Sequence, residues 1–405
     1  MIRTGLDRLL AAPERLRRLR AGAYGVLAHG AAVTGDLRPI HRALAASAAG
    51  PPSALFGPEH GFYGIEQDMI AAAGGRDPWT GAPIVSLYGD GLATLRPSPR
   101  AFAGLDVLLI DLQDVGARYY TYAATAVWAA ETALAAGCAV WVLDRPNPLG
   151  GMVVEGNLPR AGYESFVGAF RLPVRHGLTL GELMLLEARR RSWRALPEVL
   201  ALDGWERAMS WDDTGLAWIA PSPNMPAPAT ALLYPGGCLI EATELSEGRG
   251  TTRPFHLVGA PGIDPAALAD ALAARRLPGA SFVPTWFRPQ FQKHRGEACG
   301  GVELVATDRA AFRSYRTGVE LLRALAEVAP DRLAWRRAPY EFVIDRPALD
   351  LLTGGPDCRT ALERLSRGDA GGGAALDEWI AGWPADEESF RQERRAILLY
   401  PEPAA

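Results

Sequence analysis

The sequence contains no apolar run that approaches the length of a membrane span. The first eight residues, MIRTGLDR, also lack the uninterrupted apolar core of a secretory signal peptide. These absences predict a protein without membrane insertion, located in the cytoplasm, or secreted or periplasmic if an export signal has been removed. The net charge of -4 leaves no basic stripe that could follow a phosphate backbone, which argues against nucleic acid as a partner.

Cysteine is scarce and widely spaced. The chain has four cysteines, Cys138, Cys238, Cys299 and Cys358, and no two of them have the close spacing of a metal-binding or disulfide pair. A zinc ribbon and a dense disulfide framework are therefore not indicated. The simplest interpretation is four separate thiols, buried or incidental.

Several motifs of common enzyme classes are missing. No G-x-G-x-x-G follows the first predicted strand, where residues 27–32 read LAHGAA, and there is no Walker A sequence. There is no G-x-S-x-G elbow of a serine hydrolase and no H-E-x-x-H metal motif. The six histidines are scattered, so a metal site would have to be assembled in space. We therefore predict no cofactor and no metal.

The first part of the chain does contain a regular alternation of apolar strands and helices. The predicted strands are residues 24–28, 53–57, 83–88, 106–111 and 139–143, and the predicted helices are residues 6–20 (interrupted or begun at Pro13), 39–49, 98–103 and 119–136. This alternation predicts an α/β fold with a doubly wound parallel sheet.

The pattern changes twice further along the chain. Residues 150–228 are rich in loops, with one clear helix at 179–191 that begins with a capping box of Thr179 and Glu182. Later we expect helices at 265–274 and 315–328, strands at 281–287 and 302–307, and a flexible glycine loop at 371–373. These elements predict two domains, residues 1–232 and a smaller α+β domain of residues 233–405.

Carboxylates follow three of the predicted strands. Glu59 comes after the turn signal Gly57-Pro58, Asp111 and Asp114 follow the next apolar strand, and Asp144 follows the last. Because ligands bind at the carboxyl edge of open parallel sheets, this edge is the expected site. Structural roles compete with this interpretation: Glu59 could cap the following turn, and the aspartates could hold loops by accepting backbone N–H bonds.

The residue types at these positions suit glycosidic cleavage. That reaction needs a proton donor and a second group that stabilises or attacks the cationic sugar centre, usually two carboxyls. Glu59, beside His60, is the candidate acid. The glycine-dense loop with Glu247, Arg249 and Thr251 is too polar for a core, and arginine can grip a ligand carboxylate in two places. Alternatively, Glu247 and Arg249 simply pair with each other.

Several longer blocks of sequence resemble one family, the NamZ/YbbC-like exo-β-N-acetylmuramidases, long described as a domain of unknown function. The blocks are LFGPEHG (55–61), DLQDVGARYYTY (111–122), DRPNP (144–148), PSPNMP (221–226), SEGRGTT (246–252) and CGG (299–301). The resemblance implies a Rossmann-like domain followed by a smaller domain, with the site in the cleft between them. It also implies removal of a terminal N-acetylmuramic acid residue from the non-reducing end of peptidoglycan fragments.

The resemblance favours Glu59 as the principal catalytic carboxylate, with Glu247 or a strand-end aspartate as its partner. The lactyl carboxylate of muramic acid would be held by Arg249 or Arg118. The sequence departs from the family at His29, where an asparagine is expected. The expected site residues are Glu59, Glu247 and Asp114 as catalytic groups, and His60, Asp111, Arg118, Tyr119, Tyr120, Asp144, Asn224, Arg249 and Thr251 as substrate-binding residues.

Two other functions use the same cleft. A non-catalytic sugar-binding protein would bind muropeptides or other saccharides without cleaving them. A metal-dependent hydrolase would lose its activity when the metal is chelated.

Overall fold

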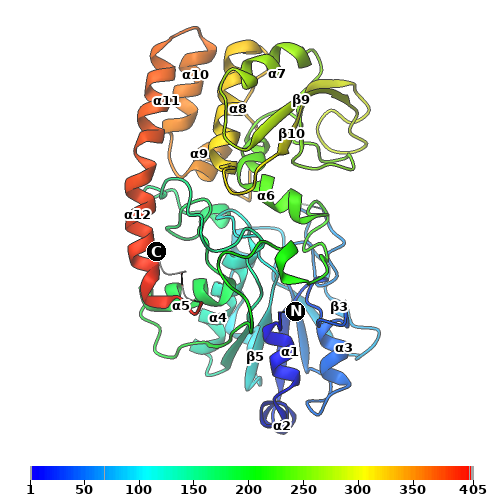
Figure 1. The fold of residues 1–405 in the computed structure, drawn as a ribbon. Coiled ribbons are helices and arrows are strands. Elements are labelled where there is room, and N and C mark those ends of the chain that lie inside the picture. The colour runs from blue at the N-terminus through cyan, green and yellow to red at the C-terminus, as the bar shows by residue number, and fades with distance from the viewer. Residues whose placement is uncertain (1, 68, 401, 403–405) are drawn as a thin grey trace.

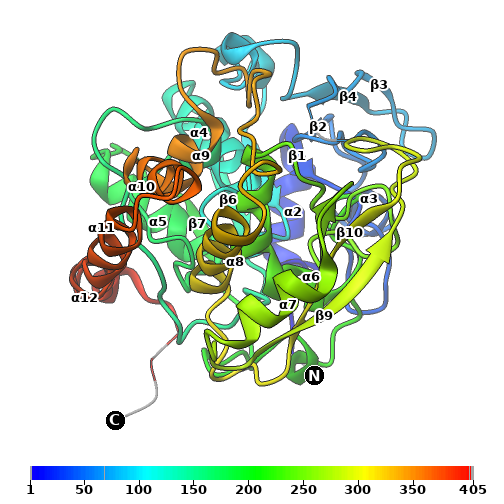
Figure 2. The same ribbon diagram turned by 90° about the horizontal axis from the view of Figure 1, so that it is seen from above.

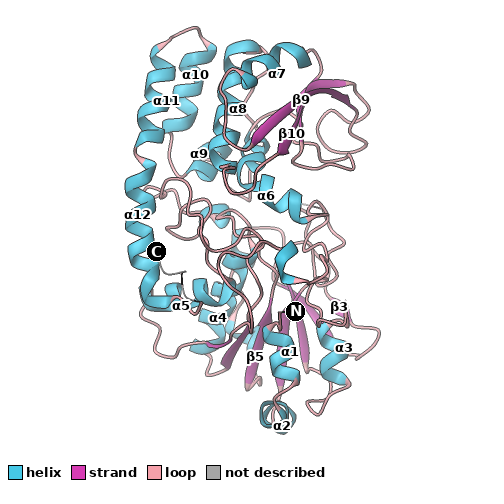
Figure 3. Ribbon diagram, in the orientation of Figure 1, coloured by secondary structure: helices cyan, strands magenta, loops and turns pink. Residues whose placement is uncertain are grey.

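The computed structural model describes residues 2–67, 69–400 and 402. It has a larger body built on a seven-stranded sheet and a smaller body built on a three-stranded sheet (Figure 1). Loops fill most of the space between the two sheets (Figure 3), as the loop-rich character of residues 150–228 predicted.

The larger sheet has the strand order β3-β4-β2-β1-β5-β6-β7. Its strands are β1 (Tyr24–Ala28), β2 (Ala54–Gly57), β3 (Gly75–Arg76), β4 (Pro83–Ser86), β5 (Val107–Asp111), β6 (Ala139–Leu143) and β7 (Glu198–Leu200). All neighbours pair in parallel except β3, which is antiparallel to β4. The predicted parallel sheet is confirmed, and β2, β5 and β6 bring their carboxyl ends to one edge.

Helices cover both faces of this sheet. One face carries α1 (Gly5–Leu10), α2 (Pro13–Ala21) and α3 (Ile40–Ala45), and the other carries α4 (Tyr122–Ala135) and α5 (Leu180–Arg190). Alternate side chains of β5 divide between the two cores: Leu109 packs with the first group of helices, and Leu108 and Ile110 pack with the second. The break at Pro13 is confirmed, since this proline begins α2.

Short 3₁₀ helices occupy several connections: η1 (Leu92–Thr94), η2 (Pro99–Phe102), η3 (Phe166–Gly168), η4 (Asp212–Thr214) and, near the carboxyl end, η6 (Arg395–Ile397). The short helix expected at residues 98–103 is therefore a 3₁₀ turn. Ser98 lies at its N-cap and Pro99 begins its first turn, although the Ser98 side chain makes no capping hydrogen bond.

The smaller domain packs helices on an antiparallel sheet of order β8-β10-β9. Its elements are α6 (Pro228–Gly237), η5 (Cys238–Ala242), β8 (Leu257–Ala260), α7 (Pro265–Ala273), β9 (Ala280–Phe287), β10 (Cys299–Ala306), α8 (Ser314–Val328), α9 (Ala348–Thr353), α10 (Asp357–Ser366) and α11 (Gly371–Ala381). Seen from above, α8 lies between α10 and the strands β9 and β10 (Figure 2). The boundary predicted near residue 232 falls inside α6.

The glycines at 371–373 do not form the flexible loop that their composition predicted. They form the first turn of α11, which packs on α10. A Cβ atom at Gly372 would lie 2.5 Å from the carbonyl oxygen of Ala361, so this glycine permits a close helix–helix contact. The prediction failed because chain flexibility and close packing both select glycine.

A second close contact joins α6 to α8 through Gly236 and Gly318. A Cβ at Gly318 would lie 2.4 Å from the carbonyl oxygen of Gly236. We expect Gly318→Ala to lower the free energy of unfolding by about 1–3 kcal/mol despite the better helix propensity of alanine, because the two backbones must separate. Chemical denaturation measures this loss. Gly91→Ala, where a Cβ meets nothing within 4 Å, serves as the control, and equal effects of the two substitutions would contradict the packing argument.

The carboxyl-terminal segment returns to the first domain. Helix α12 (Trp383–Arg394) runs alongside that domain (Figure 1), and the Nη1 of Arg394 donates to the carbonyl oxygen of His176 at 3.0 Å. The Tyr400 hydroxyl donates to Oδ2 of Asp144 at 2.7 Å. Residues 383–400 therefore form a clasp between the domains.

All four cysteines are buried and free, as the simplest interpretation of their spacing predicted. Within the described ranges, none of the helices combines the length and apolar character that a bilayer crossing requires.

Candidate active site

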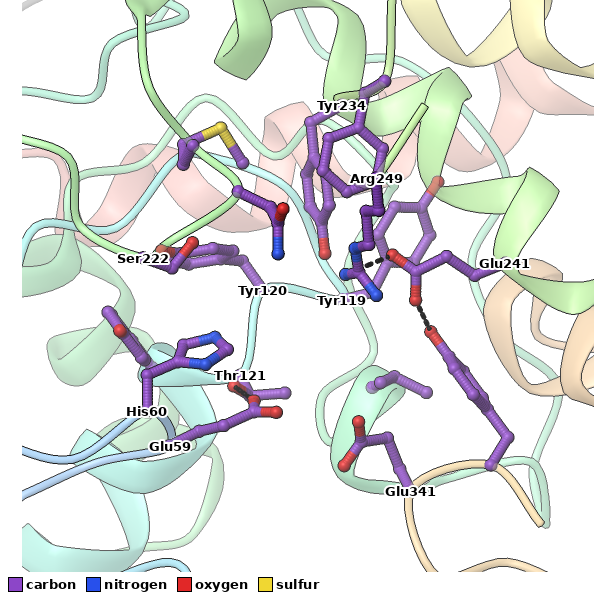
Figure 4. Close-up of a pocket in the computed structure, with 16 residues that line it drawn as sticks. Glu59, His60, Tyr119, Tyr120, Thr121, Ser222, Tyr234, Glu241, Arg249 and Glu341 are labelled. Atoms are coloured by element: carbon purple, nitrogen blue, oxygen red, sulfur yellow. Dashed lines mark hydrogen bonds and ion pairs between the residues drawn. The ribbon is translucent and has the colours of Figure 1, made fainter. Parts of the chain in front are cut away.

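A cleft lies between the two domains, next to the carboxyl edge of the larger sheet. It encloses about 520 Å³, including space open to solvent. The first domain lines it with residues after β2, the segment that enters α4 and the loop near Asn224, and the second domain adds Tyr234, Glu241, Arg249, Tyr340 and Glu341. Figure 4 shows these side chains surrounding one cavity.

Glu59 lies two residues beyond β2 and is buried. Its Oε2 accepts a hydrogen bond from the Thr121 hydroxyl at 2.6 Å, and its Oε1 accepts one from the backbone N–H of Met69 at 3.4 Å. The predicted position, just past the carboxyl end of the strand, is confirmed. These two donors fix the direction of the carboxyl group into the cleft.

His60 follows in a left-handed backbone conformation with φ +69°. Its Nδ1 lies 2.8 Å from the carbonyl oxygen of Glu66, which can only accept. In the neutral ring the proton therefore sits on Nδ1, which leaves Nε2 as an acceptor. Asn224, also on the cleft, donates from Nδ2 to Oε1 of Gln67 at 2.9 Å.

The tyrosines that precede and begin α4 divide into packing and cleft groups. The hydroxyls of Tyr119 and Tyr122 donate to the carbonyl oxygens of Pro235 and Pro221. The Tyr120 hydroxyl is buried in the cleft wall beside the side chains of Ser222 and Tyr122, and it makes no well-aligned hydrogen bond with the residues described. Burial raises the pKa of Tyr120, so its hydroxyl stays protonated and can donate to a ligand.

The second-domain wall is organised around Arg249. Its Nη2 donates to Oε1 of Glu241 at 2.9 Å, and the other carboxyl oxygen of Glu241 accepts from the Tyr340 hydroxyl at 2.8 Å. Glu247 lies behind the wall, where it accepts from Nζ of Lys293 at 2.9 Å. Its Oε1 is 3.9 Å from Nε of Arg249, so Glu241 is the closer ionic partner of this arginine.

Three expected site residues lie away from the cleft lining. Asp111 is fully buried in an ion pair with Arg145, with 3.0 Å between its Oδ2 and Nη2 of the arginine. Asp144 accepts from Thr179, the backbone of Gly181 and Tyr400, and burial raises its pKa to about 6. Thr251 donates to its own loop, at the carbonyl oxygen of Gly248. Asp144 thus matches the structural alternative, since it accepts a backbone N–H bond from Gly181, whereas Asp111 is held by the side chain of Arg145.

Asp114 and Arg118 are also buried outside the lining. Oδ1 of Asp114 accepts from the backbone N–H of Gly116 at 2.6 Å, and burial raises the pKa of this carboxyl to about 7. Arg118 donates to the carbonyl oxygens of Asn157, Leu172 and Leu352, each at 2.7 Å. Its guanidinium thus holds backbone from both domains and does not face the cleft.

His29 supports the floor of the site. Its Nδ1 and Nε2 lie 3.1 and 2.8 Å from the backbone nitrogens of Ala31 and Gln113, and its ring centroid is 4.9 Å from that of Tyr122. Burial, with smaller contributions from Arg145 and His60, lowers its pKa to about 3, so the ring is neutral. The histidine joins the loops after β1 and β5.

Seven polar residues of the cleft were not among the expected site residues: Thr121, Tyr122, Ser222, Tyr234, Glu241, Tyr340 and Glu341. Thr121, Tyr122 and Ser222 lie inside the family-like blocks 111–122 and 221–226, and those blocks were the usable signal for them. The other four lie in segments with no motif and no strand-end position, so nothing local marked them. Among the residues that the structure describes, no three His, Cys, Asp or Glu side chains are grouped to hold a metal ion.

The cleft between the Rossmann-like domain and the smaller domain is lined by a buried carboxyl group, an arginine and tyrosine hydroxyls. This arrangement fits a two-domain glycoside hydrolase. Family comparison gives the particular family. Residues 24–229 match the family model "Exo-beta-N-acetylmuramidase NamZ, N-terminal", and residues 232–400 match its C-terminal counterpart. The chain belongs to the NamZ family of exo-β-N-acetylmuramidases, which confirms the resemblance.

Full-length relatives agree with this membership. The chain is 37% identical to the peptidoglycan beta-N-acetylmuramidase NamZ of Bacillus subtilis over 399 residues, 98% of this chain and 91% of the relative. Crystal structures of two DUF1343 family proteins from Bacteroides fragilis share the fold, with TM-scores of 0.85 and 0.73 at 30% and 25% identity. Each comparison covers 99% of both chains, so the predicted fold class is confirmed across both domains.

Proposed function

We propose that this protein hydrolyses the β-glycosidic bond of a terminal, non-reducing N-acetylmuramic acid residue in peptidoglycan fragments. One observation carries the proposal: Glu59 of the first domain and Arg249 of the second face the same cleft. A carboxyl proton donor and a cation are the two groups that this substrate demands. The cleavage needs the proton, and the lactyl group of muramic acid brings a carboxylate.

In this proposal Glu59 is the general acid. Its carboxyl proton passes to the glycosidic oxygen while the bond from that oxygen to the anomeric carbon breaks. The Thr121 hydroxyl and the Met69 N–H hold the carboxyl in position for this transfer. The Tyr120 hydroxyl is available for the sugar itself.

Release of aryl alcohol from an aryl N-acetyl-β-muramide tests the proposal, with the matching glucosaminide as the comparison substrate. We expect cleavage of the muramide, undiminished by chelator. A protein that binds muramide and releases no alcohol would be a sugar-binding protein. Release that stops in chelator would establish the metal-dependent hydrolase.

Arg249 should determine the preference for muramic acid over glucosamine. We expect Arg249→Lys to lower kcat/KM for the muramide about 10–100-fold, because a charge-assisted, two-point contact contributes about 1.5–3 kcal/mol. Lysine retains a positive charge for Glu241 but cannot make the two-point contact. Activity on the glucosaminide, which has no lactyl carboxylate, should not fall.

Steady-state kinetics on the two substrates measure this change in preference. Arg253→Lys is the control, because Arg253 is half exposed and pairs with Glu303. If Arg249→Lys lowered kcat/KM equally for the muramide and the glucosaminide, the arginine would stabilise the cleft without binding the lactyl group.

A further inference from the structure

We propose that Glu341, which the second domain contributes, is the second catalytic carboxylate and faces the anomeric carbon opposite the acid Glu59. The inference deepens the proposed function and rests on it. It replaces the two partners that the sequence favoured, since Glu247 and Asp114 are buried outside the cleft lining.

The backbone of Glu341 is held in an unusual conformation. Tyr340 and Val343 exchange two backbone hydrogen bonds, of 3.1 and 2.9 Å, which close a tight two-residue turn. Its central residues, Glu341 and Phe342, have φ of +45° and +65°, values that such turns usually assign to asparagine or glycine. A left-handed conformation is unfavourable for a non-glycine residue and persists where the surroundings enforce it, often at functional sites.

The surroundings fix the side chain as well. Phe342 packs against Tyr88, with 5.6 Å between the ring centroids, and the hydroxyl of Tyr88 donates to Oε2 of Glu341 at 3.1 Å. The carboxyl group is buried and lines the cleft. In Figure 4 the carboxylates of Glu341 and Glu59 point toward each other across the cavity. The strained turn thus places a carboxylate of the second domain opposite the acid of the first.

Glu241 is the other glutamate on this wall, but both of its carboxyl oxygens accept hydrogen bonds from neighbouring side chains of the cleft. Oε1 accepts from Arg249 and Oε2 accepts from Tyr340. This arrangement suits the positioning of Arg249 for the lactyl carboxylate. Glu341, whose carboxylate lies opposite that of Glu59, is the better candidate to face the sugar ring.

The chemistry is balanced with one water molecule. Glu59 gives its proton to the glycosidic oxygen, which keeps the electron pair of the broken bond, and positive charge develops at the anomeric carbon. Either Glu341 takes a proton from the water that attacks this carbon, or Glu341 bonds to the carbon and water then displaces it, giving its proton to Glu59. In both routes the Glu341 carboxylate faces the anomeric carbon.

Two substrates and one added nucleophile test the role. A dinitrophenyl muramide has a leaving group that needs no proton, and a muramyl disaccharide has one that does. Glu341→Ala should lose two or more orders of magnitude on both substrates, whereas Glu59→Ala should lose far more on the disaccharide. Added azide should restore alcohol release by Glu341→Ala and yield the α-muramyl azide, because azide occupies the space of the lost carboxylate.

The outcomes separate the two proposals. If the wild type cleaves neither substrate, the proposed function fails. If the wild type cleaves both but Glu341→Ala retains activity within about tenfold, or is not restored by azide while it still binds N-acetylmuramic acid, Glu341 is not the catalytic partner. Ile344→Ala, an exposed substitution in the same loop, should keep full activity and excludes a general effect of altering this segment.

Discussion

Glu59→Gln is expected to lower kcat/KM for a muramyl disaccharide by two or more orders of magnitude, because glutamine cannot deliver the proton that the leaving oxygen requires. The amide is close in shape to the carboxyl group, and its oxygen can still accept from the Thr121 hydroxyl, so only the longer contact with the Met69 N–H is lost. Binding of N-acetylmuramic acid should therefore persist.

Kinetics on the disaccharide and calorimetric titration with N-acetylmuramic acid measure the two effects separately. Glu66→Gln is a matched control from the same loop, since Glu66 contacts His60 through its backbone carbonyl oxygen and its side chain is outside the cleft lining. Comparable activity of Glu59→Gln and the wild type would remove Glu59 from the role of acid.

Glu182→Ala should cost about 3–5 kcal/mol of stability, the typical loss when one partner of a buried ion pair is removed. Glu182 and Arg207 are fully buried and paired, so the substitution leaves a guanidinium in the core without its counter-charge. The same carboxyl accepts from the backbone N–H of Thr179 at 3.1 Å, which completes the predicted capping box, and from that of Leu399 at 2.9 Å.

Equilibrium unfolding in denaturant measures this loss. Glu198→Ala removes an ion pair with Arg15 in which both side chains are about two-fifths exposed, and it should change stability by no more than about 1 kcal/mol. If the two substitutions cost the same, burial of the Glu182 pair would not control its contribution.

The larger sheet could be predicted from the sequence because its buried parallel strands have a distinctive pattern. Central strands such as β5 are covered on both faces, so nearly every residue is apolar and the run stands out between polar turns. The position of Glu59 followed from the same pattern, since Gly57-Pro58 ends the strand and places the next side chain at the sheet edge.

The rest of the cleft depends on contacts between residues distant in sequence, which no local pattern records. Arg118 follows a strand-end loop, as a ligand-binding arginine would. In the structure, however, its guanidinium is buried and donates to backbone carbonyl oxygens, including that of Leu352, which lies far away in the sequence. Asp144 is likewise bound by a residue far away in the sequence, since its carboxyl group accepts a hydrogen bond from the Tyr400 hydroxyl. Glu341 reaches the cleft on a strained turn, and neither of the two central positions of that turn, Glu341 and Phe342, has a usual turn residue.

The clasp formed by residues 383–400 has a consequence for biosynthesis. Asp144 and Glu182 emerge from the ribosome long before Tyr400 and Leu399, which supply hydrogen bonds to their carboxyl groups. Until the clasp has been synthesised, the carboxyl groups of Asp144 and Glu182 therefore lack these hydrogen bonds. The final packing of the first domain is completed only when the clasp closes, after residues 383–400 have been synthesised.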